Sequence, residues 1–187
     1  YVKILIDAMM ANGVYADDIR GWNLESVVSS ARLHDIGKIA IPDSILNKPG
    51  SLTPEEYHEM KTHSSAGERI IDQIVARTGE AEFLHNAKLS AAYHHERWNG
   101  TGYPYGLKET EIPLHGRIMA IVDVYDALTS ERPYTQAFSS EEAVKIIMDD
   151  AGKHFDPAIA DVFFKIKDQI EAARVKLTQQ RQQDDKK

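Results

Sequence analysis

The stretch that decides the fold is Leu33-His34-Asp35-Ile36-Gly37-Lys38, in which a histidine and an aspartate stand side by side just before a glycine that can end a helix. Adjacent helical residues point about 100° apart, so the two side chains cannot act as parallel ligands within a regular helix. At a fraying helix end they can converge on one metal ion or bridge two, and the carboxylate is the group able to bridge. The pair therefore predicts a metal site at the end of a helix.

The composition limits the kinds of protein and site. With 187 residues, 42% of them hydrophobic, the chain is long enough for one domain with one sizeable core. It has no cysteine, which excludes disulfides and thiolate zinc sites and leaves imidazole, carboxylate and water as metal ligands, a set that suits iron, manganese or zinc. The net charge of −7 argues against binding of long nucleic acid, but a small phosphate ester at a metal centre is compatible with it.

Three further expectations concern membrane contact, the start of the chain and its end. No run approaches the roughly 20 apolar residues that cross a bilayer and no charged-then-apolar leader opens the chain, so we expect a soluble, cytoplasmic protein without membrane contact. The chain begins at Tyr1 inside an apolar helical pattern, so we expect that part of the first helix lies upstream. Residues 179–187 are polar, and we expect a disordered tail there and a single domain over residues 1–178.

Apolar residues recur at helical spacing almost throughout, so the sequence predicts an all-α fold. Asn23 is expected to cap the second helix, and Thr53 and Ser139 each open a capping box. Residues 39–50, with two prolines and a glycine, are expected to form a connector. Further helices are expected over 64–76, from about 81 to 93, over 114–128, and from 157 through 166.

Candidate metal ligands recur at a steady interval. Intervals of 29, 31 and 28 residues separate His34 from His63, His63 from His94, and His95 from Asp123. Each interval is about what a helix, a turn and a returning helix need, so each hairpin would bring one more ligand back to the same end of a bundle. After His94-His95, residues 96–113 form the longest stretch without a helical period, and such a loop in a compact domain is usually functional.

Two of these segments resemble the motifs of the HD-GYP family, a branch of the HD-domain metal-dependent phosphohydrolases. They are His34-Asp35-Ile36-Gly37-Lys38 and the run His-His-Glu-Arg-Trp-Asn-Gly-Thr-Gly-Tyr-Pro over residues 94–104. The resemblance continues through Asp-Val-Tyr-Asp-Ala-Leu-Thr-Ser-Glu-Arg-Pro-Tyr at 123–134 and His-Phe-Asp-Pro at 154–157, and so covers about residues 27–164. It implies an all-α HD-type bundle with two or three divalent ions, commonly iron or manganese, at one end. It also implies hydrolysis of cyclic di-GMP to linear pGpG, and often on to GMP, in bacterial signalling.

The resemblance also assigns roles to residues of this chain. Asp35 would bridge two ions at the catalytic centre, and Lys38 would face the scissile phosphate. Arg132 matches an arginine that contacts phosphate, while Tyr103, Gly100 and Gly102 belong to the loop on the substrate side. The implied metal ligands are His34, Asp35, His63, His94, His95 and Asp123.

Other residues are expected to be structural or are left open. His58, His85 and His115 have no ligand-type neighbour in the sequence, so surface or core packing is expected for them. His154 is expected to be structural although it matches a family position, and for Tyr134 packing and substrate contact both remain open. The family commonly carries a receiver or other sensor domain upstream, so we expect one here, as in two-component systems. A homodimer is left open.

The sequence departs from the family pattern at three places. Asn99 replaces the usual aspartate of the loop, and Thr135 stands where a second basic phosphate contact is common. The family's early helix offers a glutamate and a histidine to the metals, but here Glu25 is the only glutamate before Leu33 and no histidine precedes His34. We therefore expect these two ligands upstream of Tyr1. These departures keep two alternatives open: a module that binds a cyclic dinucleotide or a protein without turnover, and an HD phosphohydrolase acting on another nucleotide.

Overall fold

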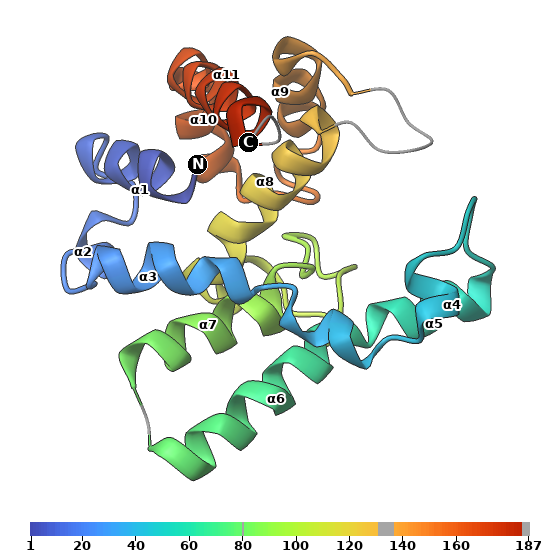
Figure 1. Ribbon diagram of the computed structural model, residues 1–187. Helices are drawn as coiled ribbons and strands as arrows, with labels where there is room; N and C mark the ends of the chain where they lie inside the picture. Colours follow the sequence, from blue (N-terminus) through green and yellow to red (C-terminus); the bar gives the residue numbers. More distant parts are fainter. Residues whose placement is uncertain (80, 131–136, 185–187) are drawn as a thin grey trace.

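The computed structural model describes residues 1–79, 81–130 and 137–184, and this part of the chain is helical, as predicted (Figure 1). It contains no sheet, only isolated bridges between Asn99 and Lys108 and between Ala151 and Phe155. In chain order the α-helices are α1 (Val2–Ala11), α2 (Ala16–Ile19), α3 (Leu24–Ser30), α4 (Asp43–Leu46), α5 (Pro54–Lys61), α6 (His63–Thr78), α7 (Glu82–Tyr93), α8 (Leu114–Thr129), α9 (Ser140–Asp149), α10 (Pro157–Lys165) and α11 (Lys167–Asp184). The 3-10 helices are η1 (Ala31–Leu33), η2 (Ile36–Ala40) and η3 (Glu109–Glu111).

The helices begin where their capping residues predict. The Asn23 side chain accepts the backbone N–H of Ser26 at the start of α3. Thr53 and Ser139 form complete capping boxes at the starts of α5 and α9, each with a glutamate three residues later. These bonds satisfy backbone donors that have no partner inside a helix, so the local sequence determines where these helices begin.

The helices enclose two cores of different size. The larger core is formed by α1, α3, α8, α9, α10 and α11. Its largest fully buried side chains include Tyr125 and Phe163, whose ring centroids lie 5.3 Å apart. The smaller core, around Ile71, lies between α6 and α7, which run back along each other as a hairpin (Figure 1). Because α7 also packs against α3 and α8, it joins the hairpin to the larger core.

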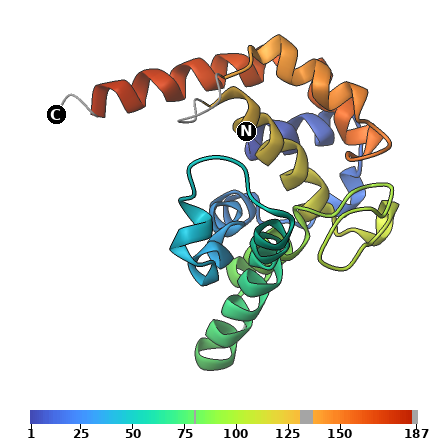
Figure 2. The ribbon, with the colours of Figure 1, turned by 90° about the vertical axis from the view of Figure 1, so that its right-hand side faces the viewer.

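Three parts of the fold differ from the expectations. A short helix, α4, lies inside the expected connector, and an additional helix, α11, follows the helix that opens at Pro157, which ends at Lys165 as expected. The expectation of a disordered tail over 179–187 is wrong for residues 179–184, because α11 continues to Asp184 and extends away from the body of the domain (Figure 2). Glutamine, arginine and lysine favour helix, and no glycine or proline interrupts them. None of the described helices is both long enough and apolar enough to span a membrane.

Gly37 has a different role from the one expected. It does not end a helix, because α3 has already ended at Ser30 and Gly37 lies inside η2. A Cβ atom at Gly37 would overlap the carbonyl oxygen of His63 and the amide nitrogen of Gly67, both in α6. The glycine is therefore needed for the close approach of η2 to α6, which fixes the position of the preceding His34-Asp35 pair.

His115 packs in the interior, as expected. Its ring stacks on Trp22 with a centroid separation of 4.1 Å, and its Nε2 atom is buried without a hydrogen-bond partner among the described residues. Burial, with a smaller contribution from His85, lowers the pKa of His115 to about 4. The histidine is therefore neutral in the folded protein at neutral pH.

We expect the variant His115→Phe to lose less stability than the parent when the pH is lowered. Because the pKa of His115 in the folded state lies below its usual 6.5, the unfolded chain binds more protons between about pH 6.5 and 4, so the parent loses stability as the pH falls through this window. The free energies of unfolding at pH 7 and 4.5, measured by urea titration, should show a loss about 2–3 kcal/mol smaller in the variant. The exposed His58, changed to Phe, is the control. Parallel pH dependence of parent and His115→Phe would contradict the buried neutral form.

Candidate metal centre

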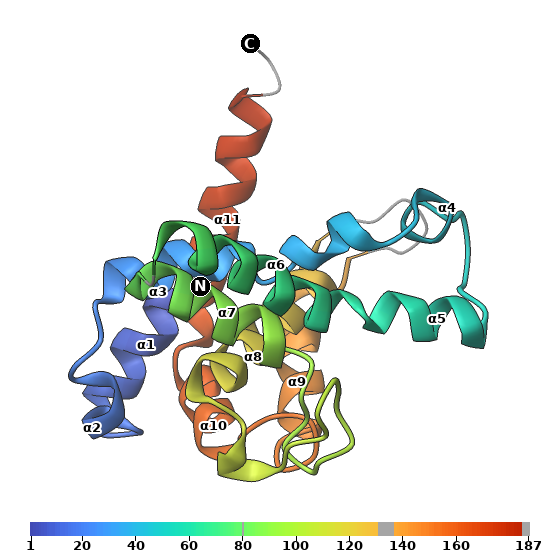
Figure 3. The same ribbon diagram turned by 90° about the horizontal axis from the view of Figure 1, so that it is seen from below.

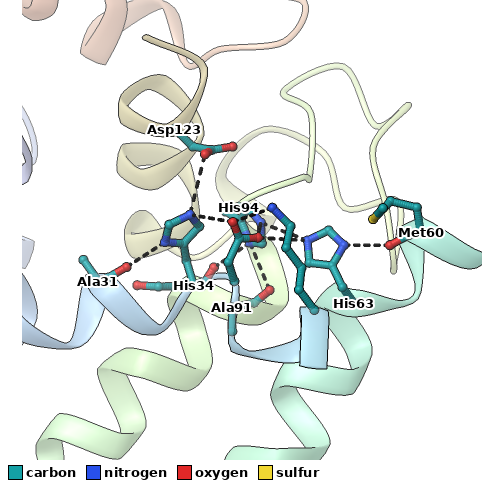
Figure 4. Close-up of polar contacts among 10 residues, drawn as sticks. Ala31, His34, Met60, His63, Ala91, His94 and Asp123 are labelled. Carbon is teal, nitrogen blue, oxygen red and sulfur yellow. Dashed lines mark hydrogen bonds and ion pairs between the residues drawn. The ribbon is translucent and has the colours of Figure 1, made fainter. Parts of the chain in front are cut away.

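The structure brings all six predicted ligands together, from segments far apart in the sequence, and Figure 4 labels four of them, His34, His63, His94 and Asp123. His34 and Asp35 follow η1, and His63 is the first residue of α6. His94 directly follows α7, and Asp123 lies in α8. The hairpin of α6 and α7 brings the end of α7 back beside the start of α6. His63 and His94 therefore meet there, as the spacing of the candidate ligands predicts.

Three of the ligands form a compact histidine group. Each of His63, His94 and His95 offers one ring nitrogen, and the three atoms lie within 4.8 Å of one another. The Oδ1 atom of Asp35 lies 3.5 Å from Nε2 of His63 and 3.9 Å from Nε2 of His94. Three imidazole nitrogens beside a carboxylate oxygen form a donor set typical of a divalent transition metal.

A second group forms on the other side of Asp35. Nε2 of His34 lies 3.4 Å from the Oδ2 atom of Asp35 and 3.6 Å from Oδ1 of Asp123. The two oxygens of Asp35 therefore face different histidines, one oxygen toward each group. This is the arrangement expected of a carboxylate shared by two cations.

Backbone carbonyls orient the histidine rings (Figure 4). Nδ1 of His34 lies 2.9 Å from the carbonyl oxygen of Ala31, and Nδ1 of His63 lies 2.7 Å from that of Met60. Nδ1 of His94 lies 3.0 Å from the carbonyl oxygen of Ala91. A carbonyl only accepts, so each Nδ1 carries the proton, and in a neutral ring Nε2 then presents a lone pair toward the centre.

The histidine group fits a bound cation. The Nε2 atoms of His63 and His94 lie 3.3 Å apart, yet in the neutral rings both are acceptors and cannot bond to each other. Burial, followed by the charges of neighbouring histidines, lowers the pKa of His94 to about 4 and that of His95 to about 2. Burial lowers the pKa of His63 as well. These rings are therefore neutral at neutral pH, the form that ligates metal ions.

The carboxylate side of the centre also favours positive charge. Burial lowers the pKa of His34, but hydrogen bonds with Asp123 and Asp35 outweigh it and raise this pKa to about 10. Burial likewise opposes ionisation of Asp35, yet His34 and Lys38 hold its pKa well below the usual range. Nζ of Lys38 donates a hydrogen bond to Oδ2 of Asp35 at 2.6 Å. A cavity of about 290 Å³ opens beside His34, Asp35, Lys38 and Asp123.

The glycine-rich loop lies against the histidine group. The Tyr103 ring stacks on His95 with centroids 4.8 Å apart. Gly102 was expected to let the backbone approach a ligand, but the close approach is to the chain itself, since a Cβ there would overlap the backbone of Glu96 and Arg97. Gly100 adopts a φ of +80°, which glycine accommodates without strain. Asn99 retains an acceptor function, because its Oδ1 accepts the N–H and hydroxyl of Thr101.

Glu96 is a residue whose role sequence reasoning missed. The residue is 2% exposed, and its two carboxylate oxygens accept the backbone N–H groups of Tyr105, Gly106 and Leu107 at 2.7, 3.2 and 3.0 Å. Burial raises the pKa of Glu96, and the three N–H donors oppose that shift. Because Glu96 directly follows His95, its carboxylate fixes the loop to the part of the chain that carries this histidine. The sequence signal that could have indicated this role is the position of the acidic residue, directly after two histidines and directly before the glycine-rich loop.

The remaining predictions have different outcomes. His154 packs as a structural residue, as expected. Nη2 of Arg97 lies 3.3 Å from its Nδ1 atom, its ring stacks on Phe155, and burial lowers its pKa to about 4. Arg132, Tyr134 and Thr135 lie outside the described residues, so the roles assigned to Arg132 and Tyr134 and the effect of Thr135 stay predictions.

Comparison with known proteins identifies the family. The family model of the HD domain matches residues 6–159. The chain is 44% identical, over 92% of its length, to a cyclic di-GMP phosphodiesterase of Vibrio cholerae, of which it covers 35%. A cyclic di-GMP phosphodiesterase response regulator of Xanthomonas campestris pv. campestris is 43% identical over 76% of this chain and 36% of the relative. A 3'3'-cGAMP-specific phosphodiesterase 2 of Vibrio cholerae is 39% identical over 82% of this chain and 28% of the relative.

The chain thus spans only about a third of the length of these curated relatives. The matched region nevertheless includes all six clustered side chains and the loop that contains Tyr103. The chain therefore belongs to the HD domain family, and to its HD-GYP type.

Proposed function

We propose that this chain is the catalytic domain of a metal-dependent phosphodiesterase that hydrolyses cyclic di-GMP to linear pGpG. The observation that carries the proposal is the position of Asp35, one oxygen of which faces His34 while the other faces the histidine group. The relatives named as cyclic di-GMP phosphodiesterases support the choice of substrate. The cofactors would be two or three divalent ions, iron or manganese, of which the described residues offer ligands for two.

The reaction adds water across one phosphodiester bond. The bond between phosphorus and one ribose oxygen breaks, the phosphorus gains a hydroxyl group, and the ribose oxygen gains a proton. Bound divalent cations would supply an activated water molecule and neutralise charge on the phosphate. Asp35 would hold both cations, together with His34 and Asp123 on one side and with the histidine group of His63, His94 and His95 on the other.

Lys38 has the charge and position to act on the substrate. Its ammonium group lies beside Asp35, and Lys38 lines the 290 Å³ cavity. A phosphate oxygen bound there would receive a charge-assisted hydrogen bond, and the departing ribose oxygen could take a proton from the same group. Tyr103, stacked on His95, adds an aromatic face beside the histidine group for a guanine base.

The relative that is specific for 3'3'-cGAMP supports a second candidate substrate, the mixed cyclic dinucleotide. Hydrolysis of both dinucleotides should therefore be compared. The response regulator among the relatives supports a receiver or other sensor domain as the regulatory partner in the longer protein. A module that binds without turnover is the alternative that the product assay decides: if the metal-loaded protein binds cyclic di-GMP but releases no linear product, the enzyme proposal fails.

We expect Asp35→Ala to abolish turnover and metal binding together. The change removes the carboxylate between the two groups, so both cations lose a ligand and the activated water is lost, and a fall of several powers of ten is expected. Release of pGpG, measured by chromatography, should be compared with metal content from elemental analysis. Asp161→Ala removes an exposed carboxylate that pairs with Lys165 on α10, and it should change neither quantity. Full metal content in the Asp35 variant would contradict the bridging role.

We expect Lys38→Met to lower turnover while metal content is retained. The change removes a charged hydrogen-bond donor but no ligand, and a bond to a charged group is worth about 1.5–3 kcal/mol, so a loss of about tenfold to a hundredfold is expected. The matched control is Lys3→Met, since Lys3 forms an ion pair of the same length, 2.6 Å, with Asp7 on α1. Unchanged activity in Lys38→Met would exclude a catalytic role for the ammonium group.

We expect Glu96→Gln to loosen the loop that contains Tyr103. The amide of glutamine has only one acceptor atom, so its NH₂ group would face a backbone N–H of residues 105–107. Hydrogen exchange of residues 103–107 should become faster and KM for cyclic di-GMP should rise about tenfold, with metal content retained. Glu111→Gln, at an exposed carboxylate that accepts one N–H in the same loop, is the control. Equal exchange in parent and Glu96→Gln would show that Glu96 does not hold the loop.

A further inference from the structure

A lysine outside the predicted ligand set lies close to the centre. Lys61 is the last residue of α5, two residues before His63, and Figure 3 shows α5 extending outward from the start of α6. Its Nζ atom lies 5.3 Å from the centroid of the Tyr57 ring and 5.7 Å from that of the Tyr103 ring. We call these three residues the Lys61 cradle. Because Tyr103 stacks on His95, the cradle lies one aromatic ring outward from the histidine group.

The charge of Lys61 is free to meet an anion. No carboxylate of the described residues lies within ion-pair distance of its ammonium group, whereas Lys38, Lys48 and Lys88 each pair with an acidic side chain. Two aromatic faces hold the cation in place without neutralising it. Tyr57 is 52% exposed, so the cradle is open to solvent on the side of α5.

The cradle and Lys38 contact different residues of the centre. Lys38 pairs with the Oδ2 atom of Asp35, the oxygen that faces His34. Lys61 lies beyond His95, on the side of the histidine group. A ligand that reaches both lysines must therefore carry two separated negative charges. A cyclic dinucleotide does so, since its two phosphodiesters lie on opposite sides of one ring.

We propose that Lys61 binds the phosphate of a cyclic dinucleotide that is not being cleaved, with the rings of Tyr57 and Tyr103 beside the attached nucleoside. The inference rests on the proposed function and adds to it a second phosphate subsite. The Lys61 ammonium group donates a charge-assisted hydrogen bond to that phosphate and takes no part in bond cleavage. The subsite therefore acts on substrate affinity, and a phosphodiester with a single phosphate does not use it.

The test compares two substrates in Lys61→Met, which keeps the apolar stem and removes the charge. For cyclic di-GMP we expect KM to rise by about tenfold to a hundredfold with kcat within about twofold of the parent. For bis(4-nitrophenyl) phosphate, which has one phosphate, we expect kcat/KM within about twofold of the parent, with metal content unchanged. Lys61→Arg should restore most of the affinity because it restores the charge. Lys167→Met is the matched control, since the Lys167 ammonium group lies 5.1 Å from the Phe164 ring, outside the centre.

Equilibrium dialysis with cyclic di-GMP separates this inference from the proposed function. If the parent releases no linear product, the proposed function fails, while the affinities of parent and Lys61→Met still decide the subsite. Equal affinities, or an equal loss toward both substrates, overturn the subsite. An equal loss together with reduced metal content would mean that Lys61 supports the fold of the centre instead. A loss confined to the dinucleotide supports the second phosphate contact.

Discussion

The shared position of Asp35 depends on one close approach between backbones. The two oxygens of Asp35 face His34 on one side and His63 on the other only because η2 lies directly against the start of α6. Gly37 permits that contact, since any side chain there would overlap the backbone of His63 and Gly67. The packing of two short segments therefore sets the electrostatics of the whole centre. His34 and Lys38 then keep the buried carboxylate ionised.

The position of the histidines at helix ends has a physical cause. The last carbonyls of a helix have no partner inside it and can accept other donors. Ala31, Met60 and Ala91 lie at or near such ends, and their carbonyls accept the Nδ1–H groups of His34, His63 and His94. Helix ends thus provide the bonds that orient the rings, and the hairpin of α6 and α7 brings two of those ends together. This arrangement explains why side chains next to each other in sequence can both face one centre.

The sequence predicted what depends on local pattern and on repeated spacing. The capping boxes at Thr53 and Ser139 and the meeting of the six clustered side chains are of this kind. The role of Gly37 and the three bonds to Glu96 were not predicted, because they depend on backbones that meet only after folding. The extent of α11 was also missed, since a polar composition does not distinguish an exposed helix from a disordered tail. The ligand roles came from the family resemblance rather than from helical periodicity.

The charge of the chain places a condition on the proposed reaction. The whole chain has a net charge of −7, and Asp35 and Asp123 bring two carboxylates into the centre, while the histidine group is neutral at neutral pH. A phosphodiester that approached the protein side chains alone would meet these carboxylates. The nearby positive charges are already engaged or distant. Protonated His34 lies between Asp35 and Asp123, Lys38 is paired with Asp35, and Lys61 lies one aromatic ring away from the histidine group. Attraction of the scissile phosphate therefore requires the divalent cations, so the proposed enzyme must load its metals before it can bind its substrate productively.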